Sequence, residues 1–365
     1  MVRRTIVEIL AVGVFLIILL NLEALVVRLP SDTAANPAPG ERIGVIHVHT
    51  SARDGGKPLA DIVAIARKDH LTFLAPTDHN LVVQLPDAAA DPPGFTLLAG
   101  EEVSTSSGHV LVLGVPQDWQ AGPSYDRAVL RTAHASHGTT FIAHPFGTHP
   151  SWTDWGTNNF DGIEVWNEDA AWRANGAVRL VMSLAIYPTN TDLALARLAR
   201  RPDESLAKWD QMLRERHVAG ICGADAHGAL WITKKFMIPF PGYEAAFNLA
   251  RQHILVDPRA VNRGQADQDM LVSALREGHS YCALDALYPA TGFRYTITGS
   301  GGAPSEQGDT REWAAGEELH ISLPAGSSTP LIKVLRNGAE VAETQGRSLD
   351  EPLAGPGVYR TEVYL

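Results

Sequence analysis

The sequence predicts a mixed α/β protein, in which a strand–helix barrel is followed by a small antiparallel β domain. Between residue 43 and about residue 284, short apolar runs alternate with amphipathic stretches, as is typical of buried parallel strands connected by helices. After Pro289, apolar and polar residues alternate with period two, which is typical of antiparallel strands. The length of 365 residues fits one large and one small domain.

The first 30 residues predict a membrane anchor. Residues 6–27 are strongly apolar and follow Arg3 and Arg4, and about 20 apolar residues cross a bilayer as a helix. A cleaved signal peptide is the alternative, but residues 27–30 lack a small-x-small cleavage pattern. We therefore expect an uncleaved anchor at 1–30, a tether at 31–42, and the remaining chain outside the cytoplasm.

The barrel is expected over residues 43–289. Its seven strands are predicted at 43–47, 73–76, 96–100, 109–114, 140–143, 162–165 and 219–223, from the apolar runs of the sequence. Helices are predicted at 59–69, 125–137, 170–181, 203–216, 243–251 and 268–277, from the amphipathic stretches. No GxGxxG motif follows the first strand, which favours a barrel over a doubly wound dinucleotide-binding sheet.

Residues 290–365 predict a small antiparallel β-sandwich packed on the barrel. The segments "FRYTITGS", "ELHISL", "LIKVLRNGAEVAE" and "VYRTEVYL" alternate apolar and polar residues. Asn337-Gly338 is a strong signal for a two-residue hairpin turn.

Charge and cysteine content exclude two classes of protein. The net charge of −11 and the isoelectric point near 5.7 argue against a nucleic-acid surface, which needs a concentrated basic field. Two cysteines make neither a disulfide framework nor a cysteine-rich zinc site. Cys222 lies in an apolar run, which favours a buried thiol, and pairing with Cys282 is the alternative.

Two histidines stand at the end of the first predicted strand. His47 and His49 are two residues apart, so they project from the same face of a strand. Such a pair can hold a metal ion or can be two ordinary histidines. The other strand ends decide between these readings, because ligands for an ion must converge from elsewhere.

Nearly every predicted barrel strand begins or ends with His, Asp or Glu. The candidates are Asp54, Asp78, His79, Glu101, Glu102, His109, His144, Glu164, Asp225 and His227. A parallel α/β barrel carries its active site at these strand ends. Nitrogen and oxygen ligands without thiolate suit Zn, Mn or Fe. The number of ligands exceeds the needs of one ion, so we expect two or three divalent ions joined by bridging carboxylates.

The motifs "HVHTSARDG", "TDHN", "GEEVS", "AHPFG" and "ADAHG", in this order, resemble those of the PHP (polymerase and histidinol phosphatase) family of metal-dependent hydrolases. The resemblance implies a distorted (β/α)7 barrel with two or three metal ions and, commonly, phosphoester hydrolysis. By motif, it implies ligand roles for His47, His49, Asp54, His79, Glu102, His144, Asp225 and His227. Family members often carry a further histidine where Leu111 stands. His109 lies two residues earlier on the same face, and we expect it to be a ligand.

The sequence therefore predicts a metal-dependent hydrolase, most simply a phosphoesterase, that acts on a small anionic substrate. Asp225 and His227 are expected to manage protons, and Glu164, His149 and Lys234 to contact the substrate. Glu101 is expected to face solvent, and Asp78 to orient an imidazole. The alternatives are hydrolysis of a carboxyl ester, carbamate or amide, and a non-catalytic metal-binding surface module.

Overall fold

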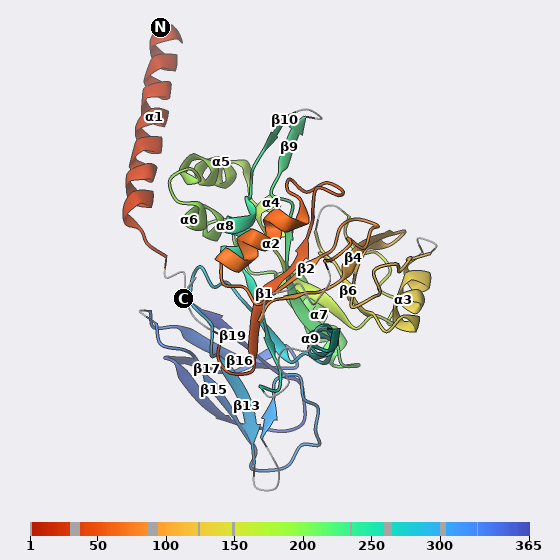
Figure 1. Ribbon diagram of the computed structural model, residues 1–365. Helices are drawn as coiled ribbons and strands as arrows, with labels where there is room; N and C mark the ends of the chain where they lie inside the picture. Colours follow the sequence, from red (N-terminus) through yellow and green to blue (C-terminus); the bar gives the residue numbers. More distant parts are fainter. Residues whose placement is uncertain are drawn as a thin grey trace.

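The computed structural model describes residues 2–29, 37–86, 94–122, 125–147, 150–233, 236–258, 265–299, 304–326 and 328–365. It contains one large curled sheet, helices around that sheet, a two-stranded antiparallel sheet of β9 (Leu230–Thr233) and β10 (Phe236–Ile238), and two further small antiparallel sheets built by the last part of the chain (Figure 1). The prediction of a mixed α/β protein with antiparallel C-terminal strands is confirmed.

Ten strands form the large sheet. They are β1 (Glu41–Val48), β2 (Phe73–Pro76), β3 (Thr96–Leu97), β4 (Gly100–Thr105), β5 (Gly108–Leu113), β6 (Thr139–Ile142), β7 (Gly162–Asn167), β8 (Ala219–Ala226), β11 (Arg251–Leu255) and β12 (Ser280–Ala283). The seven predicted strands correspond to β1, β2, β3, β5, β6, β7 and β8, whereas β4 is not predicted, because the strand expected at 96–100 reaches only its first residue. The apolar runs also do not predict β11 and β12, which pair antiparallel with each other beside the first half of β1.

The first strand of the curled sheet has parallel neighbours on both sides. β1 pairs with β2 and with β8, and parallel pairing continues from β8 to β7 and β6. On the other side, β3 pairs with β2, while β4 follows β3 almost directly and pairs with β5. The antiparallel pairing of β5 with β6 joins the two sides. The segments that follow the parallel strands therefore approach one another.

Helices cover the outside of the curled sheet. They are α2 (Leu59–Lys68), α3 (Asp126–Ala135), α4 (Glu168–Arg173), α5 (Ala177–Ile186), α6 (Thr191–Ala196), α7 (Asp203–Leu213), α8 (Tyr243–Leu249) and α9 (Gln265–Glu277). In α2, Ile62, Val63 and Ala66 recur at helical spacing and are buried. The single helix expected at 170–181 is wrong. Gly176 has an extended backbone there and separates α4 from α5, since glycine is a poor residue for a helix interior.

The last part of the chain forms two antiparallel sheets. One contains β13 (Arg294–Thr298), β14 (Ser305–Glu306), β15 (Glu318–Ser322) and β18 (Ser348–Pro352), and the other contains β16 (Leu331–Arg336), β17 (Ala339–Gln345) and β19 (Tyr359–Tyr364). Leu319 of the first sheet and Ile332 of the second are buried in one apolar cluster, so the two sheets pack face to face. Asn337 and Gly338 have positive φ angles of 53° and 85°, as the predicted hairpin turn requires.

A buried charged network fixes the start of β1 to the segment that leads into the small sheets. His253 Nδ1 lies 2.8 Å from Glu41 Oε1, and His253 Nε2 lies 3.1 Å from Asp285 Oδ2. Glu41 also accepts hydrogen bonds from the Tyr281 hydroxyl and the Gly292 backbone. Burial disfavours a charged imidazole, but Asp285 and Glu41 outweigh it and raise the pKa of His253 to about 9.

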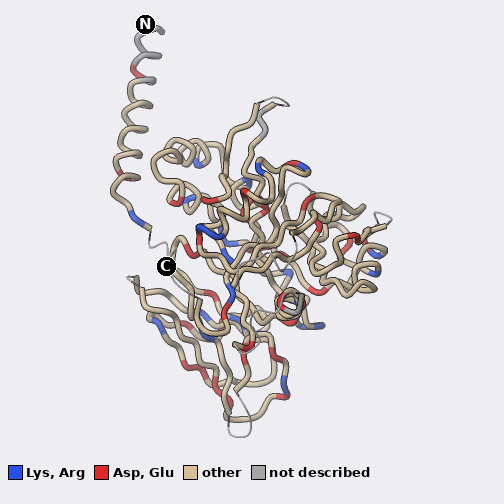
Figure 2. Tube along the Cα trace, in the orientation of Figure 1, with Lys and Arg blue, Asp and Glu red and all other residues tan. Residues whose placement is uncertain are grey.

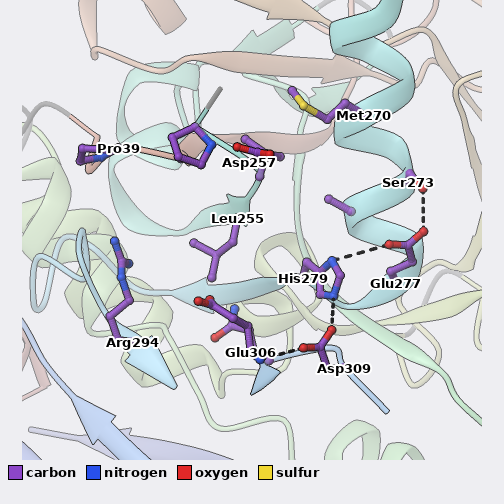
Figure 3. A pocket seen from close by; sticks show the side chains of 15 residues that line it. Pro39, Leu255, Asp257, Met270, Ser273, Glu277, His279, Arg294, Glu306 and Asp309 are labelled. Atoms are coloured by element: carbon purple, nitrogen blue, oxygen red, sulfur yellow. Dashed lines mark hydrogen bonds and ion pairs between the residues drawn. The ribbon is translucent and has the colours of Figure 1, made fainter. Parts of the chain in front are cut away.

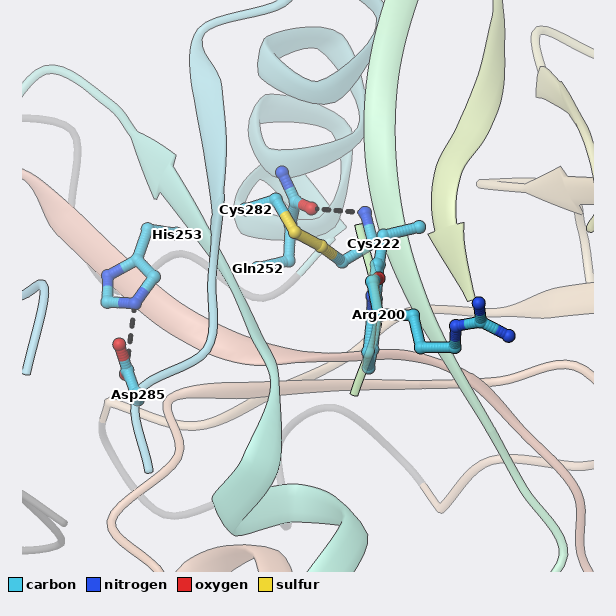
Figure 4. Close-up of a disulfide and its surroundings, with 7 residues drawn as sticks. Arg200, Cys222, Gln252, His253, Cys282 and Asp285 are labelled. Carbon is cyan, nitrogen blue, oxygen red and sulfur yellow. Dashed lines mark hydrogen bonds and ion pairs between the residues drawn. A yellow bond between two sulfur atoms is a disulfide. The ribbon is translucent and has the colours of Figure 1, made fainter. Parts of the chain in front are cut away.

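Cys222 and Cys282 form a disulfide, with their Cα atoms 5.5 Å apart (Figure 4). The expected free thiol at Cys222 is therefore wrong. Cys222 is buried as the apolar run predicts, but the curl of the sheet also brings β12 beside β8, which the sequence does not reveal. The backbone N–H of Cys222 donates to Gln252 Oε1 at 2.8 Å, so β11 also holds this part of β8.

The expected membrane anchor is wrong. The N-terminal segment is helical, as α1 (Val2–Val26), but no helix among the described residues is long and apolar enough to cross a membrane. The end of α1 contacts protein instead. Ala24 is fully buried, Asn21 donates to the Ala185 carbonyl at 3.1 Å, and Glu23 pairs with Arg197 at 2.6 Å. The localisation derived from this anchor is wrong as well. Residues 31–36 of the expected tether lie outside the described residues.

Charged residues are distributed over the whole trace. Figure 2 shows Lys and Arg mixed with Asp and Glu along the curled sheet, its helices and the small sheets. The net charge of the chain is −11. That the protein binds no nucleic acid remains a prediction.

One pocket lies between α9 and the start of the small sheets, with a volume of about 560 Å³ (Figure 3). His279 Nε2 lies 3.1 Å from Asp309 Oδ1, and His279 Nδ1 lies 3.6 Å from Glu277 Oε2. These polar groups satisfy one another. None of the predicted site residues that the structure describes lines this pocket.

Candidate metal centre

The strand ends bring nine predicted ligands into one cluster. They are His47 and His49 of β1 and its end, Asp54 in the following loop, His79 after β2, Glu102 on β4, His109 on β5, His144 after β6, and Asp225 and His227 of β8 and its end. A nitrogen or carboxylate oxygen of each lies within 3.6 Å of such an atom in another member. Residues up to 180 positions apart thus share one site.

The backbone is strained at three of these residues. The φ angles are 65° at His47, 28° at His144 and 50° at Asp225, values that residues other than glycine rarely adopt. The pairing of β1 with β2 and β8 shifts register at His47, so a bulge rather than simple alternation aims this side chain. Strain of this kind is concentrated at functional sites.

Four buried residues form the first ligand group. His47 Nε2 lies 3.2 Å from Glu102 Oε2 and 3.4 Å from Asp225 Oδ1, and His49 Nε2 lies 3.3 Å and 3.2 Å from the same two oxygens. Tetrahedral ligands about 2.1 Å from a zinc-type ion lie about 3.4 Å from one another. The four atoms therefore have the spacing of one coordination shell.

A second group surrounds the loop carboxylate Asp54. Its Oδ2 lies 3.6 Å from His79 Nε2 and 3.5 Å from His227 Nε2, and its Oδ1 lies 3.5 Å from His49 Nδ1. The rings of His49 and His227 are stacked with their centroids 4.0 Å apart. This group is more exposed than the first, because Asp54 lies on a turn at the surface.

Glu102 links the first group to a third. Its Oε1 lies 2.6 Å from His109 Nδ1 and 3.0 Å from His144 Nε2, while its Oε2 faces His47, His49 and, at 3.0 Å, His79 Nδ1. A carboxylate with histidines at both oxygens has the arrangement of a bridging ligand. His109 contacts this carboxylate directly, although it lies two residues before Leu111, the position at which family members often carry a histidine.

The chemistry of this donor set fits divalent cations. Several of its buried atoms make no hydrogen bond, namely His47 Nε2, both ring nitrogens of His49, Asp54 Oδ1, His79 Nδ1, Glu102 Oε2 and His144 Nδ1. A buried polar atom without a partner is costly. Cations among them would satisfy these atoms, and three groups of such residues could each hold an ion.

Opposite charges control ionisation in the cluster. Burial disfavours every charge there, but Asp225, Glu164 and Glu102 outweigh it and hold the pKa of His47 well above its ordinary value. The histidines in turn hold the pKa values of Glu102 and Asp225 well below the ordinary values. Against its burial, a hydrogen bond with Glu102 raises the pKa of His144 to about 9. The carboxylates are therefore ionised, which is the form that binds a cation, whereas His47 and His144 are protonated, so a cation would have to displace their protons.

Glu164 supports the cluster from behind, and its expected contact with substrate is wrong. Its Oε1 lies 2.7 Å from His47 Nδ1, and its Oε2 accepts hydrogen bonds from the His144 backbone at 2.6 Å and Asn167 Nδ2 at 3.0 Å. Glu164 is 1% exposed. It fixes the ring of His47 so that Nε2 faces the other ligands.

Tyr243 of α8 ties together three segments of the site. Its buried hydroxyl lies 2.7 Å from the carbonyl oxygens of both His49 and His227, and it accepts a hydrogen bond from the Gly56 N–H at 3.1 Å. Gly228 makes room for this contact, because a Cβ at this position would lie 2.1 Å from the tyrosine ring. The sequence does not indicate this role, since nothing in α8 marks a tyrosine that reaches β1 and β8.

A pocket of about 320 Å³ opens above the cluster. Beside six of the candidate ligands, Asp169 and Arg173 of α4 line it. The sequence analysis missed both. An acidic and a basic residue four positions apart, directly after β7 with its Glu164, are nevertheless a usable signal.

The remaining candidates have different outcomes. His149 and Lys234, expected to contact substrate, lie outside the described residues. Glu101 is 4% exposed rather than solvent-facing, and burial raises its pKa to about 7. Asp78 does not orient an imidazole as expected, because its Oδ1 accepts hydrogen bonds from the backbone and hydroxyl of Thr50 instead.

Comparison with known proteins gives structural matches at low identity. No family model matches the chain, and no curated protein sequence does. A two-domain protein from Bacteroides vulgatus containing a predicted PHP-like metal-dependent phosphoesterase is 14% identical. That match covers 93% of this chain and 88% of the other, with a TM-score of 0.44.

Two further solved structures match a smaller part of the chain. A candidate metal-dependent phosphoesterase from Bifidobacterium adolescentis is 14% identical, with 53% of this chain and 89% of the other covered and a TM-score of 0.35. An amidohydrolase from Chromobacterium violaceum, with bound sulfate and no metal, is 14% identical, with 50% and 87% covered and a TM-score of 0.31. Two of these three structures are described as metal-dependent phosphoesterases, one of them as PHP-like, the family that the sequence motifs resemble.

Proposed function

We propose that this protein is a metal-dependent hydrolase that cleaves phosphoesters. The observation that supports this is the bridging position of Glu102 between two sets of histidines, of which His109 alone is partly exposed. Such a carboxylate holds two ions a few ångströms apart, the spacing needed for in-line displacement at phosphorus. When bound, the ions supply an activated water and stabilise negative charge on the substrate oxygens.

The proposed ligands follow from the three groups. His47, His49, Glu102 and Asp225 would hold one ion, His79, Glu102 and His109 a second, and His49, Asp54, His79 and His227 a third. We add His144 to the second group, because its Nε2 lies 3.0 Å from Glu102 Oε1. Nitrogen and oxygen donors without thiolate favour Zn, Mn or Fe.

The proton-transfer roles go to the two residues at the end of β8. Asp225 Oδ1 faces the first ligand group, and its Oδ2 accepts a long hydrogen bond from Asn167 Nδ2 at 3.4 Å. We assign Asp225 to accept the proton of the attacking water. His227 lines the pocket and is partly exposed, and we assign it to protonate the leaving group.

The same proposal covers the architecture. We read the curled sheet with its helices, over residues 43–289, as a distorted (β/α)7 barrel, and residues 290–365 as a β-sandwich domain. The parallel bridge between His79, after β2, and Glu102 of β4 supports closure of this barrel.

The test uses the full chain. Metal content is measured by mass spectrometry as purified, and the protein is then loaded with Mn, Zn or Fe. It is assayed with p-nitrophenyl phosphate, bis(p-nitrophenyl) phosphate and p-nitrophenyl acetate. We expect turnover of a phosphate ester that His47→Ala lowers at least a hundredfold. His70→Asn is the control, because His70 is exposed and has a positive φ of 57° that asparagine accepts.

Each other outcome selects a different reading. Turnover of the acetate ester without the phosphates would replace the proposal with a carboxyl-ester, carbamate or amide hydrolase. Bound metal without turnover of any ester would favour a non-catalytic module. Full activity in His47→Ala would remove the proposed mechanism.

A further inference from the structure

The pocket above the ligand cluster contains one side chain with a permanent positive charge. Among the described residues that line it, the others are candidate ligands and Asp169, whereas Arg173 is a guanidinium that stays protonated. Arg173 is the last residue of α4, about 9 Å along the helix axis from Asn167, where β7 ends. It therefore approaches the pocket from its edge rather than from the strand ends that carry the candidate ligands.

Two contacts hold the guanidinium in one orientation. Arg173 Nε donates to Asp169 Oδ2, one helical turn earlier, and Arg173 Cζ lies 4.4 Å from the centroid of the Trp172 ring. The helix that carries both residues is itself capped, because Asn167 Oδ1 accepts a hydrogen bond from the Ala170 N–H at 2.8 Å. The position of the guanidinium is thus set before any ligand arrives.

Apart from the stacking on Trp172, the polar contact of Arg173 with the described part of the chain is made by Nε, which leaves its terminal nitrogens available as donors. The side chain is 35% exposed. Asp169 balances its charge, so Arg173 adds little net charge to the pocket. What it adds is a planar pair of N–H donors, the geometry that binds a carboxylate or a phosphate in bidentate fashion.

We propose that Arg173 binds a second anionic group of the substrate, a phosphate or a carboxylate, while the ester that is cleaved lies at the ligand cluster. This inference rests on the proposed phosphoesterase function. It names the substrate class as small phosphomonoesters that carry another oxyanion a few bonds away. A pocket of about 320 Å³ lies at the lower end of the range for small-molecule sites, which agrees with a substrate of this size.

The test compares three substrates with one three-carbon chain. They are propyl phosphate, 3-(phosphonooxy)propanoate and propane-1,3-diyl bisphosphate, and phosphate release is measured with the metal-loaded full chain. We expect kcat/KM for the last two to exceed that for propyl phosphate by about ten- to a hundredfold, mainly through KM, as bidentate charged hydrogen bonds do. Comparison of these two shows whether a carboxylate or a phosphate is preferred.

Three variants assign the preference to Arg173. Arg173→Gln should reduce it to less than threefold with unchanged metal content, and Arg173→Lys should restore only part of it, because an ammonium group lacks the planar fork. Arg179→Gln is the matched control, since Arg179 is an exposed arginine on α5 that does not line the pocket. It should behave like the parent protein.

Binding provides a readout that does not depend on turnover. The dissociation constants of 4-phosphonobutanoate and butylphosphonate, which match two of the substrates in shape, are measured by calorimetry on the same proteins. If the parent protein prefers the carboxylate compound and Arg173→Gln abolishes this preference, the proposal is supported even if no ester is cleaved. The absence of ester cleavage would contradict only the proposed function. Equal affinities in the parent protein, or a preference that survives in Arg173→Gln, would overturn the role of Arg173 and leave phosphoester cleavage standing.

Discussion

Replacement of Cys282 by serine tests the contribution of the disulfide to stability. Cys282 is exposed, so the change creates no cavity, and the stabilisation that is lost is that of the bond to Cys222. The two cysteines are 60 residues apart. Chain entropy for a closed loop of this length corresponds to about 14 cal/mol/K, or about 4 kcal/mol at 25 °C. This is a large part of the stability of a typical domain.

The assay is denaturant unfolding of both proteins, with and without reducing agent. We expect Cys282→Ser to lower the free energy of unfolding by about 4 kcal/mol. Reducing agent should lower the free energy of unfolding of the parent protein to the same value and leave that of the variant unchanged. The denatured parent protein should show no free thiol before reduction, because the chain has two cysteines. Equal stabilities without reducing agent, or two titratable thiols, would refute the reasoning.

Three further predictions concern the site and its supports. Glu102→Gln should reduce bound metal by at least half in mass spectrometry and leave the far-ultraviolet circular dichroism unchanged, and full metal content would contradict the bridging role. Tyr243→Phe should weaken metal binding measured by competition with a chelator and destabilise the protein by about 1–3 kcal/mol, whereas Tyr125→Phe, at an exposed position, should do neither. The raised pKa of His253 stabilises the fold by roughly 3 kcal/mol below pH 6.5. This stabilisation should disappear as the pH rises through 9, so that the stability difference between the parent protein and His253→Gln narrows between pH 6 and pH 10.

The strand ends are the part of the site that the sequence predicts well. Apolar runs mark buried strands, and parallel strands end at one edge, so residues such as His79 and His144 can be placed together without knowing the angles between strands. His109 belongs to this group as well, although its strand is antiparallel to β6. Its place in the cluster is predicted because it lies two residues before Leu111, where family members often carry a histidine, and therefore on the same face of the strand.

Contacts across the sheet are what the sequence does not predict. The sequence places Glu164 on β7, but it does not show that this side chain is buried against the ring of His47. The bond between Cys222 and Cys282 depends in the same way on the curl of the sheet. The N-terminal stretch is predicted correctly as a helix, but its contacts to Ala185 and Arg197 depend on tertiary packing.

The strained backbone of the site is held by side chains that are not themselves candidate ligands. Positive φ angles at His47, His144 and Asp225 cost about 1–3 kcal/mol each, so something must favour these conformations over relaxed ones. Glu164 does so at two of them, because one carboxylate contacts the ring of His47 and the backbone N–H of His144. Tyr243 acts near the third, Asp225, because its hydroxyl contacts the backbone carbonyl of His227, two residues further along the chain. These contacts are made between protein groups alone, so the folded chain itself contributes to aiming the donor atoms of the site.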